Sequence, residues 1–244
     1  MFVQTAKMLA TALAMSLTMP LQVRAQMLIG TQGMINVPTA DMNDAGTFVG
    51  GLSFVPKQME LVAGNFDTGI YYIDFTPFKW LELTFRETLL KTTKIENGVT
   101  KKGFYQQDRS TTVRLRPIKE NDKSLLPSVV VGVNDIYSDH GSSRYTCVYG
   151  AVTKHLAVAS AGTVGLHAGY AYKYDTGVVY DGVFGGVDFR PSFCRDFRAM
   201  VEWDSQGLNF GLHAAILRNV NLMVFTRQFN SVGAGVSYQY TIRY

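Results

Sequence analysis

Hydrophobic and polar residues alternate along most of the chain from residue 47 to its end. Successive side chains of a β-strand point to opposite faces, so this period of two predicts strands with one apolar and one polar face. Glycine, proline, asparagine and aspartate separate the alternating stretches and predict turns. We expect twelve strands, at residues 47–55, 69–76, 80–91, 105–116, 128–134, 144–153, 162–174, 182–190, 196–204, 208–217, 220–228 and 231–244.

The last strand shows the pattern most clearly. One of its faces is apolar and carries Val232, Ala234, Val236, Tyr238, Tyr240, Ile242 and Tyr244. In a soluble protein an exposed strand of this kind would promote aggregation, whereas a closed membrane barrel places such a face against lipid. We therefore predict an all-β fold, a transmembrane antiparallel up-and-down β-barrel of about 12 strands with a short N-terminal periplasmic segment.

The same strand resembles the C-terminal strand of bacterial outer-membrane barrels. In those proteins a terminal aromatic residue and alternating apolar residues form the signal that the barrel-assembly machinery reads. The matching positions are Tyr238, Tyr240, Ile242 and Tyr244. The resemblance implies the barrel-assembly machinery and outer-membrane lipid as partners.

An even number of strands places both ends of the barrel on one side of the membrane, which for an outer-membrane barrel is the periplasm. Periplasmic turns should be short and external loops longer. Residues 77–79 and 218–219 meet the first expectation. Residues 56–68, 92–104 and 134–143 are expected to be external loops.

The N-terminus has the features of a signal peptide. Lys7 precedes a mostly apolar run at residues 8–19, Pro20 follows it, and cleavage is expected before Gln26. We divide the chain into a signal peptide (1–25), a Gly/Pro-rich motif segment (26–46) and a barrel (47–244). The predicted location is the outer membrane of a Gram-negative cell.

Composition supports this class and excludes others. Hydrophobic residues make up 47% of the chain, yet the mean hydropathy is only +0.04, because apolar and polar residues are mixed. The net charge of +4 makes no case for a nucleic-acid partner. Cys147 and Cys194 are expected to be unpaired, with Cys147 between lipid-facing Tyr145 and Tyr149.

A motif follows the predicted cleavage site. It has the form G-x-x-G-hydrophobic-I-x-x-P-T-A, followed by a second Gly-Thr pair before the first strand, and comprises Gly30, Gly33, Met34, Ile35, Pro38, Thr39, Ala40, Gly46 and Thr47. This pattern resembles the opening of the YjbH family of outer-membrane barrel proteins associated with exopolysaccharide production. The resemblance implies a non-enzymatic role in exporting or assembling a surface polysaccharide, with anionic polysaccharide or polysaccharide-export proteins as candidate partners.

Many charged residues lie on the polar faces of the predicted strands. These faces should point into the lumen, because a charge that faces lipid is costly. The charged residues are Glu82, Arg86, Arg114, Arg116, Lys173, Asp188, Arg190, Arg198, Glu202, Arg227 and Arg243. One interpretation is a passive, basic-lined conduit for an anionic glycan. The alternative is a closed, structural or partner-binding barrel whose charged pairs brace the wall, and a lumen of this size favours it.

The sequence gives little evidence for a catalytic site or a metal site. His140 and His155 fall in predicted connections, whereas His167 and His213 share the inward phase and could approach each other. No G-x-S-x-G or H-x-x-E-H pattern accompanies them, so a barrel enzyme acting on lipid or glycan is the less favoured alternative. Asp135, Asp139, Asp175 and Asp181 are predicted to be solvated loop charges, and we expect no metal and no cofactor.

The motif segment itself has two possible places. It could enter the barrel as a partial plug or remain periplasmic. Met34, Ile35 and Val37 would not favour free solution. We predict that the segment packs at the periplasmic rim.

Overall fold

The computed structural model describes residues 26–59, 67–121, 123–138, 145–174, 181–217 and 219–242. Its strands form a closed antiparallel barrel in which each strand pairs with its neighbours in the chain and β1 pairs with β12. The strands are β1 (Thr47–Val55), β2 (Thr68–Phe78), β3 (Leu81–Glu96), β4 (Val99–Ile118), β5 (Ser128–Ser138), β6 (Cys147–Val158), β7 (Gly162–Tyr172), β8 (Gly182–Pro191), β9 (Phe197–Trp203), β10 (Leu208–Leu217), β11 (Val220–Arg227) and β12 (Val232–Thr241). The predicted fold class and the strand number are confirmed.

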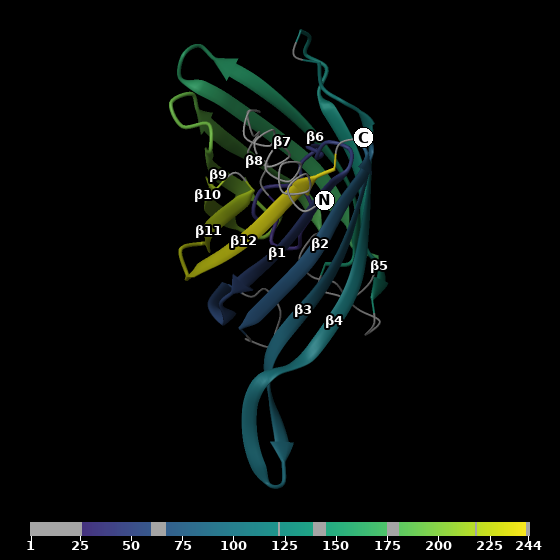
Figure 1. The fold of residues 1–244 in the computed structure, drawn as a ribbon, viewed down its shortest axis with the longest axis vertical. Helices are drawn as coiled ribbons and strands as arrows, with labels where there is room; N and C mark the ends of the chain where they lie inside the picture. The colour runs from purple at the N-terminus through teal and green to yellow at the C-terminus, as the bar shows by residue number, and fades with distance from the viewer. Residues whose placement is uncertain are drawn as a thin grey trace, which may run out of the picture.

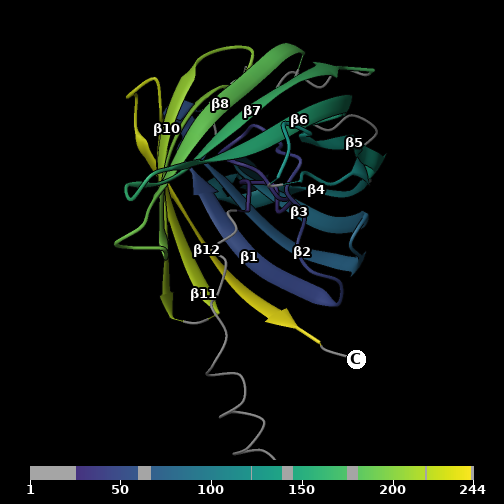
Figure 2. The same ribbon diagram turned by 90° about the horizontal axis from the view of Figure 1, so that it is seen from above.

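The two ends of the barrel differ. Thr47 pairs with Thr241, so the first and last strands begin and finish at one end, which we call the terminal end. The opposite, distal end carries the β3–β4 hairpin, which projects far beyond the other strands (Figure 1). Seen from above, the strands form a ring around the purple N-terminal segment (Figure 2).

Helical structure contributes little in the described ranges. A single 3-10 turn, η1 (Lys57–Met59), follows β1. No helix within those ranges is long and apolar enough to cross a membrane.

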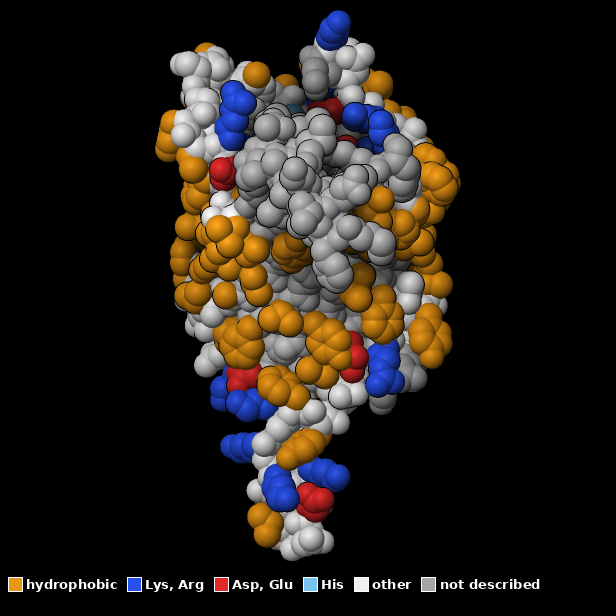
Figure 3. Space-filling view, in the orientation of Figure 1, with side chains coloured by type: hydrophobic (Ala, Val, Ile, Leu, Met, Phe, Trp, Pro, Cys, Tyr) orange, Lys and Arg blue, Asp and Glu red, His pale blue; other side chains and the backbone are white. Residues whose placement is uncertain are grey.

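The outer face of the barrel is apolar. On the face that Figure 3 shows, hydrophobic side chains gather over the middle of the barrel, while basic and acidic side chains gather toward its two ends. The outward residues include Leu52, Ile73, Val187 and Leu212, each about half exposed. On β12 the predicted apolar face is the exposed one up to Ile242, and Tyr244 lies outside the described residues. A hydrophobic belt bounded by charged ends is the surface that an outer-membrane barrel presents to lipid.

The expected external loop at residues 92–104 is wrong. These residues extend β3 and β4 into one long hairpin whose turn is Asn97-Gly98, with φ values of 52° and 75°. A two-residue turn with both φ values positive is the type I′ hairpin turn, for which Asn-Gly is the strongest local signal. The polar composition of the stretch hid that signal, because these strand residues face solvent and need no apolar phase.

The predicted orientation of Tyr145 and Tyr149 is also wrong. Both rings point inward and are buried, as is Cys147 between them. Gly132 on β5 makes this possible, because a Cβ atom there would lie 2.3 Å from the Tyr149 ring. The outward phase of β6 is carried by smaller residues such as Val148 and Val152. Both cysteines are free, as expected.

The belt predicts where a charge is tolerated. Replacing Leu212 by arginine should lower the free energy of unfolding by about 2–4 kcal/mol, because Leu212 lies mid-strand on the outer face. Urea unfolding of the refolded protein in lipid vesicles measures this cost. The matched control is Val99→Arg in the hairpin, which should be near neutral, and equal costs at the two positions would contradict the belt.

Candidate functional site

Residues 26–46 lie inside the barrel, and we call them the plug. Their side chains are almost all buried, and Met27, Ile29, Met34, Ile35 and Val37 are each at most 1% exposed. The plug therefore supplies the apolar core of the barrel, against inward residues of the strands. The prediction that this segment packs at the periplasmic rim is wrong, because its inward partners lie from one end of the lumen to the other.

The plug is tightly folded on itself, and its glycines explain part of the motif. Gly30 has a φ of +95°, and a Cβ atom there would lie 2.4 Å from the Tyr72 ring. At Gly33 a Cβ atom would lie 2.2 Å from the Met27 side chain. Gly33 and Pro38 form a β-bridge around the turn between them. Glycine is needed at both positions because the chain is too close to its neighbours for any side chain.

The turn between Gly33 and Pro38 binds a carboxylate of the barrel wall. Glu202 of β9 accepts hydrogen bonds from the backbone N–H groups of Ile35 (2.9 Å), Asn36 (2.8 Å) and Val37 (3.1 Å). It also accepts one from the side chain of Asn209 at 2.9 Å. Successive N–H groups that converge in this way form an anion-binding nest. The wall supplies the anion and the plug supplies the nest.

A second attachment lies on β3 and β4, near the terminal end. Arg114 donates from Nη1 to both carboxylate oxygens of Glu82 at 2.8 Å, and neither side chain is exposed. Glu82 also accepts the N–H of Gln32 at 2.8 Å, and Arg114 donates to the carbonyl oxygen of Thr39. A buried ion pair is stable only when its remaining donors and acceptors are satisfied. Here the plug backbone supplies a donor to Glu82 and acceptors to Nη2 of Arg114.

A third attachment runs through four wall residues. Arg198 donates to the carbonyl oxygen of Gly33 at 3.2 Å and to Asp188 at 2.7 Å. The other partner of that Asp188 oxygen is Nε2 of His167, at 2.6 Å, and Nδ1 of His167 lies 2.9 Å from Oγ1 of Thr153. Thr153 in turn accepts the N–H of Ala40 at 2.8 Å. The chain of polar groups therefore begins and ends on the plug.

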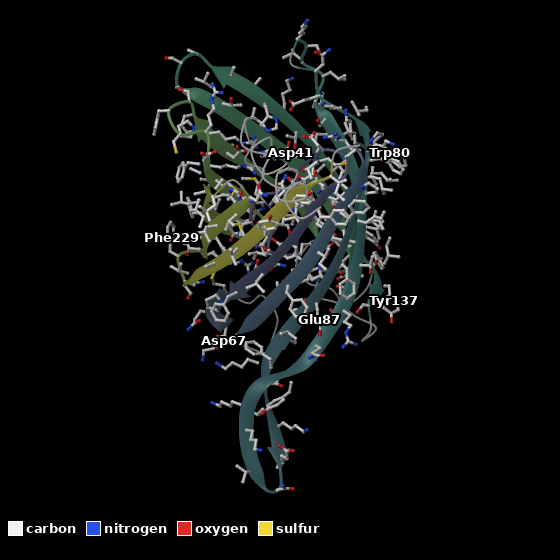
Figure 4. The ribbon with its side chains drawn as sticks, in the orientation of Figure 1. Asp41, Asp67, Trp80, Glu87, Tyr137 and Phe229 are labelled. Atoms are coloured by element: carbon white, nitrogen blue, oxygen red, sulfur yellow. The ribbon has the colours of Figure 1, made fainter. Side chains whose placement is uncertain are left out.

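Asp41 lies in the last part of the plug, between the buried motif and β1. Its carboxylate lies 3.7 Å from His155 and 3.9 Å from Arg190, and His155 also contacts Glu120. Burial opposes ionisation of Asp41, but the electrostatic interactions with His155 and Arg190 outweigh it and hold the pKa of Asp41 below its ordinary value. Asp41 lies within the barrel outline, whereas Glu87, Tyr137 and Asp67 lie toward the distal end (Figure 4). His155 belongs to β6, so its predicted place in a connection is wrong.

The distal end has charge pairs of its own. Arg86 pairs with Asp135, both buried, and lies over the Tyr145 ring at 4.5 Å from the centroid. The predicted loop position of Asp135 is therefore wrong, because it lies in β5. Arg227 lies 3.6 Å from Asp204 and donates to the carbonyl oxygen of Met59.

Most of the predicted lumen residues in the described ranges thus face inward, and Arg116 and Lys173 lie at the rims. Arg116 donates to the carbonyl oxygen of Lys79 at the terminal end. Lys173 is exposed beyond β7 at the distal end and pairs with Asp181 at 3.2 Å. Arg243, His140, Asp139 and Asp175 lie outside the described residues.

The hydroxyl, imidazole and carboxylate of Thr153, His167 and Asp188 have the order of a catalytic triad. Thr153 is 1% exposed, however, and its hydroxyl accepts a hydrogen bond from the backbone N–H of Ala40 in the plug. His213 lies apart from them, beside a small polar cavity that Gln26, Ser53 and Asn221 also line. Within the described residues, no group of three or more histidine, cysteine or acidic side chains could hold a metal ion.

Comparison with known proteins identifies the family. The family described as "Exopolysaccharide biosynthesis protein YbjH" (YjbH) matches the chain over residues 25–243. The chain belongs to the YjbH family. No curated protein matched it.

Two solved structures are similar to this YjbH-family chain. One is an outer membrane channel from Pseudomonas putida F1, at 11% identity and a TM-score of 0.38, covering 83% of this chain and 98% of that one. The other is the outer membrane phospholipase of Salmonella typhi, solved as a dimer with bound calcium. It has 11% identity and a TM-score of 0.36, covering 81% of this chain and 90% of that one. Neither similarity bears on the function of the chain.

Sequence reasoning missed the polar residues that complete the plug contacts. Thr153, Asn209 and Asp204 are inward, and Asn36 of the plug donates to Asp204 at 3.1 Å. Thr153 and Asn209 are uncharged, and uncharged inward residues are common in any barrel, so no local signal marks these two. Asp204 did have a local signal, because it lies two residues after the inward carboxylate Glu202 and therefore shares its phase.

The nest contact should carry much of the stability of this YjbH-family barrel. Replacing Glu202 by alanine leaves three buried N–H groups without an acceptor. The free energy of unfolding should therefore fall by roughly 3 kcal/mol or more. Urea unfolding in lipid vesicles measures the change. Glu96→Ala in the exposed hairpin is the control, and an equally small effect of both variants would contradict the nest.

The fit of the plug should depend on Gly30. Alanine there would meet the Tyr72 ring at a positive φ, so the plug should seat poorly and become sensitive to added protease. Gly50→Ala is the matched control, because the nearest atom to a Cβ there is 4.0 Å away. Protection of the plug in both variants, measured by limited proteolysis and mass spectrometry, would show that Gly30 is dispensable.

Proposed function

We propose that this protein is a closed outer-membrane barrel that supports exopolysaccharide production as a non-enzymatic scaffold for the export or assembly of the glycan. Membership of the YjbH family supports the link to exopolysaccharide biosynthesis. The main support for a closed barrel is that the inward charged side chains bind the plug. Glu82, Arg114, Arg198 and Glu202 bind the backbone of the plug.

This use of charge argues against the passive conduit. An anionic glycan moving through the lumen would need arginine side chains that face water, as in the basic rings of anion-selective pores. Arg86, Arg114 and Arg198 are instead at most 1% exposed. Arg114 and Arg198 are bonded to the plug and Arg86 to Asp135 of the wall, so these arginines stabilise a filled lumen that leaves no room for a polymer.

The rigid barrel would then act through its two ends, with polysaccharide-export proteins and the growing glycan as its partners. Outer-membrane barrels have short periplasmic turns and longer external loops. The terminal end, with its short connections, is accordingly proposed as the periplasmic one. The distal end with the long hairpin would face outward.

Planar-bilayer recording tests the closed state. The protein lacking residues 1–25 should insert without steady current, because the plug fills the lumen. Deleting residues 26–45 as well should produce steady current, since a lumen of twelve strands is then unfilled. Heat-modifiable migration on gels controls for folding of the deletion variant.

The opposite result has a clear meaning. Steady, anion-selective current through the protein with its plug, weakened by Arg114→Glu, would contradict the closed scaffold. It would support a conduit instead. If the deletion variant does not fold, the variant with both Gly30→Ala and Glu202→Ala serves in its place. Current through that variant, and none through the parent, supports the plug as the closure.

A further inference from the structure

The β3–β4 hairpin leaves the barrel and enters solvent. From Lys91 to Tyr105 nearly every side chain is exposed on both faces of the two-stranded ribbon. We call residues 91–105 the projecting hairpin. The turn at Asn97 is six residue steps along the strand from Lys91, so the tip lies about 20 Å beyond the barrel. Basic side chains are visible along it (Figure 3).

Positive charge is concentrated on this hairpin. It carries four lysines and one glutamate, although the chain as a whole is close to balanced. Lys94 lies directly opposite Lys101 in the strand register. Like charges in such a pair destabilise a hairpin. Glu96 offsets only Lys101, at 3.0 Å, and Lys94 and Lys102 form no ion pair within the part of the chain that the structure describes.

An aromatic ring lies next to the lysine pair. Tyr105 is the extra residue at the bulge between the two strands, and its ring covers Gly103. A Cβ atom at Gly103 would lie 2.9 Å from that ring, so only glycine lets the ring lie against the ribbon. The ring is 46% exposed. Gly103 and Lys101 share one face of β4, about 7 Å apart along the strand.

We infer that the projecting hairpin binds an acidic polysaccharide, with the Tyr105 ring stacked on a sugar ring and Lys94 and Lys101 paired with carboxylates of the glycan. An anion between the two lysines removes the repulsion that the bare hairpin carries. An exposed aromatic face next to cations suits a sugar acid, because a sugar ring presents C–H groups to the π face and its carboxylate to the lysines. The choice of a glycan as ligand rests on the proposed function.

Binding of a defined polymer tests the inference. The probe is polygalacturonate, with neutral dextran and inorganic polyphosphate as comparisons, and the full barrel is held in lipid nanodiscs. Replacing Lys94, Lys101 and Lys102 by glutamine should weaken polygalacturonate binding by about fivefold per lysine, roughly a hundredfold in all, as for lysines at an anionic membrane surface. Binding should also weaken as salt is raised.

Matched variants separate the contributions of charge and stacking. Lys79→Gln, Lys119→Gln and Lys123→Gln together remove the same charge from the terminal end and should leave binding unchanged. Tyr105→Ala should weaken binding of polygalacturonate but not of polyphosphate. An unchanged affinity in the hairpin triple variant, an equal loss in the terminal-end variant, or equal affinity of the parent for both polyanions would overturn the inference.

The two proposals fail separately. The bilayer current depends on the plug and does not involve the hairpin. Absence of glycan binding with a closed barrel removes the hairpin inference alone. A conducting barrel that still binds polygalacturonate through Lys94 and Lys101 removes the closed scaffold and leaves the hairpin site.

Discussion

The carboxylate of Glu202 in the nest of the plug is the contact on which the interior depends. A buried carboxylate without partners would be very unstable, and three buried N–H groups without acceptors would be costly as well. Here the Glu202 carboxylate accepts hydrogen bonds from the three N–H groups of the nest and from the side chain of Asn209. The wall and the plug are therefore not stable independently in this arrangement. The filled lumen is a consequence of that mutual dependence.

The remaining polar contacts follow the same principle at other depths. Glu82 with Arg114 and Asp188 with Arg198 are buried ion pairs, and each pair also forms a hydrogen bond with the plug backbone. Apolar side chains of the plug fill the space between these contacts, as where Met34 lies against Gly186 and Ile35 against Gly211. Hydrophobic filling supplies the bulk of the contact area, whereas the charged pairs determine where each turn of the plug sits.

The interior of the barrel and its projecting hairpin have different roles in the proposed function. The plug fills the interior, so the proposed role in glycan production would depend on the surfaces of the barrel. The projecting hairpin extends well past the hydrophobic belt and carries an unfavourable lysine pair beside an exposed ring. Features that cost stability and contribute nothing to the barrel are more readily explained by a ligand than by folding.

Much of the barrel was predictable from local pattern. Alternation alone located twelve strands and assigned Glu82, Arg114, Arg198 and Glu202 to the inner face, because a period of two is a property of the strand itself. The Asn97-Gly98 turn was also present in the sequence, but the polar strands around it were mistaken for a loop. The phase of β6 was ambiguous, because Tyr149 points inward only where Gly132 of the next strand leaves room.

The sequence by itself determined the class of the protein, the faces of its strands and a motif typical of the YjbH family. Only the tertiary structure decided that the motif fills the lumen. The reason is the separation of the partners along the chain: Ile35 and Glu202 are 167 residues apart, and Arg114 and Thr39 are 75 apart. A local pattern indicates that a charge faces inward, but its partner depends on how the closed barrel brings distant strands around one segment.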